Sequence, residues 1–351
     1  MALVVANRNR ARRRGLGLVG VLRTLASYAV TLCGLLVLTF FIGRIMPVDP
    51  VTAVVGIEAD REAYMRVYYQ LGLDQPVYVQ FWRYITTIAS GDLGNAFLTG
   101  RPVIQDIARV FPATVELATA AIIVGAGLGV PLGVWAAASR GRLVDQVVRF
   151  ITLTGYATPI FWLAMMALLI FYGWLGWVGG GGRLEIYYEG IVPVRTGFIT
   201  IDSILAGEWE IFRSVLRHLV LPATLLGYNS MAYITRMTRS FMLDQLNQEY
   251  IITARVKGLS QRDVLWKHAF RNIRVQLVTI VALAYGGLLE GAVLIETVFA
   301  WPGFGQYLTN NLMAGDMNAA MGCVLLVGII FISLNLISDL LYQVFDPRTR
   351  P

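Results

Sequence analysis

The chain has 351 residues, of which 56% are hydrophobic and only 15% are charged, and its mean hydropathy is +0.62. Soluble domains carry charge on about a quarter of their residues, so this composition excludes an ordinary soluble protein. Its apolar residues form runs of about 20, the length that a helix needs to cross the bilayer. We therefore expect an all-α integral membrane protein.

Six apolar runs predict about six transmembrane helices. A signal peptide is the alternative for the first run, 24–45, because arginines precede it. However, the run is longer than the usual apolar core of about 7–15 residues, and no small-residue cleavage site follows it. We expect it to be retained as the first span. The other spans are predicted at about 113–138, 150–178, 219–234, 275–297 and 319–344.

Charged residues alternate between the segments that connect these spans. Arginine and lysine gather in the N-terminal segment 1–23, in the loop after the second span and in the loop 236–274, whereas acidic residues fill the segment 46–112. The positive-inside rule then places both termini in the cytoplasm. It makes 46–112 and 179–218 extracytoplasmic loops, 113–344 the transmembrane core and 345–351 a cytoplasmic tail. This topology accounts for the net charge of +7 better than nucleic-acid binding does.

The cytoplasmic loop 236–274 has more local structure than a charged connection needs. No helix breaker occurs in 246–257, and Gly258 suits the left-handed position that ends a helix. Ser260 and Asp263 have the spacing of a capping box that opens a second helix. The sequence therefore predicts two helices joined by an exposed elbow at Gly258. The alternative is a basic loop that lies on anionic lipid.

Two segments of this loop, TARVKGL at 253–259 and HAFRN at 268–272, resemble the EAA loop of ABC importer permeases. The resemblance is strongest to the dipeptide, oligopeptide and nickel branch. Further motifs of that family follow in order along almost the whole chain: LDQP (73–76), GDLG (91–94), PATVEL (112–117), TPIFWL (158–163), HLVLPA (218–223), ETVFAWPGFG (296–305) and DPRTR (346–350).

The resemblance implies a type I ABC importer permease fold in the bacterial inner membrane. It also implies that the elbow docks in a groove of a cytoplasmic ATPase. Carried over by position, the residues concerned are Ala254, Arg255, Lys257, Gly258, Leu259, Ser260 and Asp263. The expected partners are a similar second permease subunit, two ATPase chains that hold ATP and Mg, and an extracytoplasmic binding protein. No cofactor is expected on this chain.

Two further groups of residues are candidates for function. Trp301, Pro302 and Gly303 are expected to help form the docking face for the binding protein. Glu290 lies in the middle of the fifth predicted span, where a carboxylate is costly unless it faces a cavity or a partner. Either it faces the pathway and meets a cationic group of the substrate, or it is a buried carboxyl at the subunit interface. Structural roles are expected for Glu116 and Glu296.

The implied function is that of a permease subunit that forms half of the pathway of an ATP-driven importer. Peptides are the expected substrate, and nickel chelates, glutathione, opines or sugars are the alternatives. The chain has no P-loop, because neither of its lysines, Lys257 and Lys267, is followed by Ser or Thr. Two rival classes are an intramembrane protease, for which the spans contain no suitable catalytic set, and a channel or secondary transporter acting alone.

Overall fold

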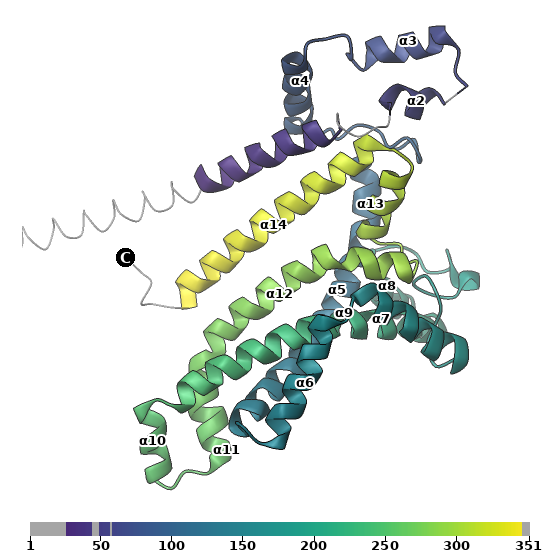
Figure 1. The fold of residues 1–351 in the computed structure, drawn as a ribbon. Helices are drawn as coiled ribbons and strands as arrows, with labels where there is room; N and C mark the ends of the chain where they lie inside the picture. The colour runs from purple at the N-terminus through teal and green to yellow at the C-terminus, as the bar shows by residue number, and fades with distance from the viewer. Residues whose placement is uncertain (1–25, 44–48, 57, 346–351) are drawn as a thin grey trace, which may run out of the picture. The chain divides into compact units, whose positions relative to one another are not determined.

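The structure, a computed structural model, describes residues 26–43, 49–56 and 58–345 (Figure 1). Within these ranges the chain is helical, and the β pairing found there is an isolated bridge between Asn95 and Pro102. The expected all-α class is therefore confirmed. The predicted segment 1–23 and most of the tail 345–351 lie outside the described residues.

The chain divides into two compact units, of which the first comprises Met1–Ile104 and Asn311–Pro351. Its described helices are Ala26–Gly43, α2 (Pro50–Val55), α3 (Arg61–Gln70), α4 (Val77–Ala89) and α14 (Met317–Phe345). The helix Ala26–Gly43 packs against α4, where the Thr39 and Tyr84 hydroxyls lie 2.7 Å apart. It also packs closely against α14, because a β-carbon on Gly43 would lie 2.6 Å from the sulfur of Met321.

The second unit, Gln105–Asn310, holds the larger helical bundle. Its elements are α5 (Val103–Ala138, which begins in the first unit), α6 (Leu143–Ala157), α7 (Ile160–Ala167), the π-helical turn η1 (Leu168–Trp174), the 3-10 turn η2 (Ile186–Tyr188), α8 (Ile199–Ala206), α9 (Trp209–Leu246), α10 (Glu249–Val256), α11 (Gln261–Asp263), the π-helical turn η3 (Val264–Ala269), α12 (Phe270–Val298) and most of α13 (Phe304–Met313).

Helix α9 is the central element of this unit, and α6, α7, α8 and α12 all pack against it. It also meets α5 at very short range, because glycines remove the side chains between the two backbones. A β-carbon on Gly133 would lie 2.7 Å from the carbonyl oxygen of Thr235, and one on Gly129 would lie 3.0 Å from that of Met231. Glycines four residues apart on one helix face are typical of tightly packed membrane helices.

Four helices among the described residues are long and apolar enough to cross a membrane: Ala26–Gly43, Val103–Ala138, Gln261–Val298 and Met317–Leu336. They agree with the first, second, fifth and sixth predicted spans. The second begins ten residues earlier than expected, since α5 continues through Pro112. Val103 and Ile107 before that proline are buried, so packing sustains the helix there.

The third predicted span, 150–178, is not a single straight helix. Helix α6 and the segment Ile160–Trp174 are bent by 100° against each other, and they count as a fifth span only as a broken pair. Thr158 between them has an extended backbone, with φ −91° and ψ 126°. The residue before a proline avoids the helical region, and Pro159 follows here, so this run forms a bent pair of helical segments.

The fourth predicted span, 219–234, lies inside the 38-residue helix α9. This helix is not among the four that meet the length and hydropathy criteria. Several of its polar residues are instead enclosed by the bundle: His218, Ser230, Thr235 and Thr238 are all buried. A helix surrounded by protein does not need an apolar surface on every side, which explains the weak signal in its sequence.

Candidate functional site

The predicted elbow consists of two helical segments joined by a tight turn. Helix α10 ends at Val256, and Gly258 then adopts the left-handed conformation with φ +77°. The backbone N–H of Gly258 donates to the carbonyl of Arg255 over 2.9 Å, and that of Leu259 donates to Ala254 over 3.3 Å. These bonds satisfy carbonyls at the end of α10. The predicted helix ending at Gly258 is confirmed, although a break at residues 247–248 separates α9 from α10.

Ser260 begins the second segment as predicted. Its hydroxyl accepts the backbone N–H of Asp263 over 3.2 Å and donates to the Asp263 carboxylate over 2.7 Å. The same carboxylate pairs with the Lys267 ammonium at 2.7 Å, one helical turn later. Helix α11, η3 and α12 then continue as one helical run, Gln261–Val298. The turn therefore passes directly from a capped elbow into a membrane helix.

The elbow is held to the bundle by an apolar cluster on its inner side. This cluster comprises Val134, Ala137, Met242, Ile251, Ala254, Val264, Ala269, Ile273 and Leu277, from α5, α9, α10, η3 and α12. Ala254 is only 5% exposed. Its methyl group therefore helps to fix α10 in place and is not available to a partner, unlike the other predicted contact residues.

The outer side of the elbow is exposed and mixes apolar with basic residues. Val256 is 82% exposed and Leu259 40%. Arg255, Lys257 and Gly258 are exposed as well. No atom lies within 4 Å of the position that a β-carbon on Gly258 would occupy. The turn thus exposes apolar residues flanked by basic ones, and its inner side is tightly packed against the bundle.

Glu290 lies on an exposed face of α12, away from the buried Leu288 and Ala292. Gly287 and Gly291 lie on the same face and have open space beside them. Leu283 and Leu294 extend this face toward the two ends of the helix. Glu290 is therefore not a carboxyl buried within its own chain, and both hypotheses for it, pathway or subunit interface, stay open.

The three candidates at 301–303 are placed differently from one another. Trp301 is 0% exposed, and its indole N–H donates to the carbonyl of Ala113 over 2.9 Å. Gly303 is buried as well, whereas Pro302 is exposed. Only Pro302 is accessible to a partner, so the expectation of a docking surface made by Trp301 and Gly303 is corrected. Tryptophan at this site fills the core, since the turn folds back over α5.

Glu296 explains why this turn is compact. Its carboxylate is fully buried and accepts the Thr114 hydroxyl over 2.6 Å and the Gln306 backbone N–H over 2.9 Å. The Thr114 hydroxyl in turn accepts the backbone N–H of Phe304 over 2.7 Å. Glu296 thus places acceptor oxygens at the N-terminus of α13, where backbone N–H groups have no partner within the helix. This geometry supports the expected structural role.

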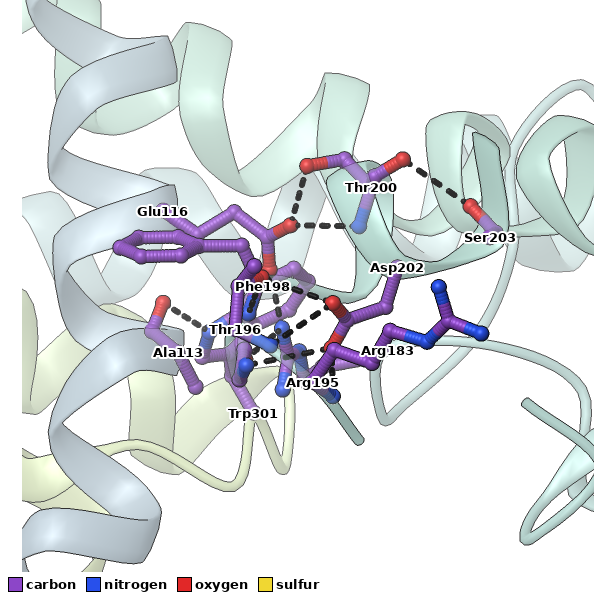
Figure 2. A network of polar contacts seen from close by, with 11 residues as sticks. Ala113, Glu116, Arg183, Arg195, Thr196, Phe198, Thr200, Asp202, Ser203 and Trp301 are labelled. Carbon is purple, nitrogen blue, oxygen red and sulfur yellow. Dashed lines mark hydrogen bonds and ion pairs between the residues drawn. The ribbon is translucent and has the colours of Figure 1, made fainter. Parts of the chain in front are cut away.

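Glu116, the other buried acidic residue of a family motif, ties the second outer loop to α5 (Figure 2). It forms an ion pair with Arg183 and accepts the backbone N–H of Thr200 over 2.8 Å and its hydroxyl over 2.6 Å. The Arg183 guanidinium also lies 5.8 Å from the centroid of the Trp301 ring. The loop, the turn and α5 are therefore held by one polar network.

Asp202 completes this network within the loop. It accepts the backbone N–H groups of Arg195, Thr196 and Gly197 over 3.2, 2.9 and 3.1 Å, together with the Thr196 hydroxyl over 2.8 Å. Burial opposes the ionised carboxylate, but these hydrogen bonds outweigh it and hold the pKa of Asp202 below its ordinary value. The loop is thus folded around a buried anion.

Comparison with known proteins agrees with this architecture. The family model described as "Binding-protein-dependent transport system inner membrane component" matches residues 129–351, and the model of its N-terminal part matches residues 18–118. The chain belongs to this family. It is therefore a multi-pass inner-membrane protein and a non-catalytic component of a transport system, and the expected type I ABC permease fold is confirmed.

Similar curated proteins cover nearly the full length of the chain. The probable D,D-dipeptide transport system permease protein DdpB of Escherichia coli is 41% identical over 319 residues, which are 91% of this chain and 94% of that protein. The di/tripeptide transport system permease protein DppB of Pseudomonas aeruginosa is 39% identical over 331 residues, 94% and 98% of the two chains. The dipeptide transport system permease protein DppB of Escherichia coli is 39% identical over 335 residues, with the same coverage.

Sequence reasoning did not anticipate Arg183 and Asp202. Arg183 follows a glycine run, Gly179–Gly182. In the structure the N–H of Gly179 donates to the carbonyl of Arg217, and that of Gly182 donates to Phe299, each over 2.8 Å. The sequence carried no distinguishing signal for Arg183, because the loop 179–218 contains four arginines beside five acidic residues.

Proposed function

We propose that this chain is the permease subunit of a peptide importer of the binding-protein-dependent ABC type. Two observations support the proposal. Relatives of almost the same length are permeases of dipeptide and di/tripeptide transport systems. The exposed elbow around Gly258 is fixed rigidly to the bundle, as a part that transmits force must be. The geometry of the elbow is the observation that supports coupling of this chain to an ATPase.

In this proposal the elbow docks on a separate ATPase chain, which holds ATP and Mg. The exposed apolar residues Ile252, Val256 and Leu259 enter a groove of the partner, and Arg255 and Lys257 make contacts at the rim. Apolar contacts at the centre with charges around them are typical of protein interfaces. Closure of two ATPases on ATP then moves both elbows and switches the pathway between its outward-open and inward-open forms.

The second half of the pathway comes from a paralogous permease subunit that packs beside α12. An ionised carboxylate that faced lipid at the position of Glu290 would be costly, so the exposed face of α12 needs a partner or a water-filled path. We place Glu290 in that path, where it meets the cationic amine of a peptide. An extracytoplasmic binding protein delivers the peptide to the outer loops.

The first experiment is ATPase activity of the assembled complex in lipid: this chain, its permease partner, two ATPases and the binding protein. The binding protein is loaded in turn with dipeptides, oligopeptides, glutathione or a nickel chelate. Stimulation by a peptide-loaded form is the expected result. Stimulation by another cargo alone contradicts the peptide assignment, and ATPases that never co-purify with the chain contradict the importer assignment.

Gly258→Arg tests the elbow directly, and Gly141→Arg is its matched control. Both glycines have left-handed backbones, φ +77° and +75°, and both have open space around them. The strain of the substitution is therefore similar at the two positions, but only Gly258 lies on the elbow. We expect Gly258→Arg to abolish stimulation and Gly141→Arg to retain it. Equal activity of the two variants would refute the coupling role of the elbow.

Glu290→Gln separates the pathway from the interface. In the pathway, loss of the charge lowers transport of peptides with a free amino terminus by about tenfold, the effect of one charge-assisted hydrogen bond, and spares amino-blocked peptides. At a subunit interface, both kinds of peptide lose transport together, with weaker association of the two permeases. Unchanged transport of both kinds contradicts the pathway role.

A further inference from the structure

A cavity of about 420 Å³ lies between α6 and α9, apart from the elbow and from the outer polar network. Three arginines line it: Arg149 from α6, and Arg236 and Arg239 from α9. Arg239 forms a bidentate ion pair with Asp145, with its Nε 2.7 Å from Oδ1 and its Nη2 2.9 Å from Oδ2. Asp145 thus neutralises Arg239, and the other two guanidinium groups leave the lining with two positive charges in excess.

The other two arginines are not neutralised by acids within the described part of the chain. Arg236 stacks on aromatic rings, its guanidinium carbon 5.0 Å from the centroid of Tyr156 and 5.9 Å from that of Tyr233. Arg149 is exposed. The cavity therefore offers donors that the protein does not use.

The position of these donors along the helices indicates what they bind. On α6, Arg149 directly precedes the apolar stretch that begins at Phe150. On α9, Arg236 directly follows the predicted apolar run 219–234. Both helices thus change from apolar to basic beside the same cavity. On a membrane protein, such a boundary lies at the level of the lipid headgroups.

Two apolar residues of the lining are strongly exposed. Phe150 and Leu153 are 68% and 67% exposed, although both lie on a helix of the bundle. A free inorganic anion gains nothing from such side chains, whereas the acyl chains of a lipid do. Basic pockets between membrane helices on the cytoplasmic side are known to recognise phosphate headgroups.

We propose that the groove between α6 and α9 binds an anionic phospholipid, whose phosphate lies among Arg149, Arg236 and Arg239. Its acyl chains lie along Phe150 and Leu153. The lipid bridges the two helices on the side of the bundle that leads into α10. This binding does not depend on the identity of the transported substrate.

Native mass spectrometry of the full-length chain in detergent tests the proposal, with phosphatidylglycerol, phosphatidylcholine and inorganic phosphate added separately. We expect retained phosphatidylglycerol, with at least about tenfold weaker retention of phosphatidylcholine, because one headgroup is anionic and the other is neutral overall. Equal retention of the two lipids overturns the proposal. Saturation by inorganic phosphate that prevents lipid binding would identify a free anion as the occupant and overturn it as well.

The double variant Arg149→Gln/Arg236→Gln removes the two unpaired charges, and Arg140→Gln, an exposed arginine of the preceding loop, is the control. The exposed positions of Arg149 and Arg236 make loss of the fold an unexpected outcome, which circular dichroism checks. We expect the double variant to weaken phosphatidylglycerol binding by about tenfold or more and the control to leave it unchanged. Equal losses in the two would mean attraction to general surface charge and would overturn the site. Loss of the lipid when the partner permease associates would show that protein covers the groove, with the same consequence.

Discussion

The elbow at Gly258 and the turn at Gly303 belong to two motifs that are equally prominent in the sequence, yet they place opposite demands on the residues in them. A β-carbon on Gly258 would meet nothing within 4 Å, whereas one on Gly303 would meet the carboxylate of Glu296. At the elbow glycine serves the backbone conformation and leaves a surface free. At the turn it makes room for the buried carboxyl group of Glu296. A motif can therefore mark a surface or an internal brace.

The largest expected effect separates these roles. Glu296→Leu removes the acceptor for the Thr114 hydroxyl and the Gln306 N–H inside the protein. Each buried donor left without a partner costs about 1–3 kcal/mol, so we expect a loss of about 2–6 kcal/mol and little folded protein. The yield of monodisperse protein and the midpoint of thermal unfolding in detergent measure it. A variant as stable as the wild type would contradict a structural role of Glu296 at the turn.

Removal of the Arg183 charge tests the ion pair with Glu116 that ties the second outer loop to α5. Arg183→Met leaves Glu116 buried without its cation, at a cost of about 3 kcal/mol. Glu116→Gln combined with Arg183→Met should be less harmful than the sum of the single changes, because no charge is then left unpaired. A double-mutant cycle on unfolding free energies gives the coupling. Additive single effects would show that the ion pair contributes nothing.

The two glycines can be compared through the same small change. Gly303→Ala forces the buried Glu296 carboxylate to move, and we expect a loss of about 1–3 kcal/mol. Gly258→Ala meets open space and costs only the left-handed backbone, about 1 kcal/mol. The midpoints of thermal unfolding of the two variants measure this difference. A larger loss of stability for Gly258→Ala than for Gly303→Ala would contradict it.

The smallest expected effect depends on pH. The folded state lowers the pKa of Asp202, so its carboxylate stabilises the fold above the unfolded pKa of about 3.9. This contribution disappears as the pH falls through the lower folded value. Asp202→Asn should therefore cost about 1–2 kcal/mol near pH 7, and the difference from wild type should shrink below about pH 4. Unfolding midpoints of the two proteins across this range test it, and a constant difference would contradict the assignment.

Local rules sufficed for the elbow. The left-handed glycine and the Ser260–Asp263 cap depend on a few neighbouring residues, so their spacing alone predicted them. The apolar runs likewise located four membrane helices, because length and hydropathy are local properties. The bend before Pro159 was also within reach of the sequence, but the length of the apolar run concealed it.

Contacts between distant segments were not within reach. Glu116 and Arg183 are 67 positions apart, and Thr114 and Glu296 are 182 apart. No spacing rule links such positions in a single sequence. The burial of Trp301 and Ala254 has the same origin, since the elements that cover them come from elsewhere in the chain. The hydropathy signal of helix α9 was weak for a related reason. Neighbouring helices bury several of its polar residues, and its own composition does not show this.

The unbroken length of α9 has a mechanical consequence. At 1.5 Å per residue its 38 residues extend over about 57 Å, and only two residues separate its end from α10. A rod of this length that pivots by about 10° around its middle moves each end by about 5 Å. A small tilt of α9, together with the helices packed against its end, would therefore be enough to displace the elbow by about one helical turn.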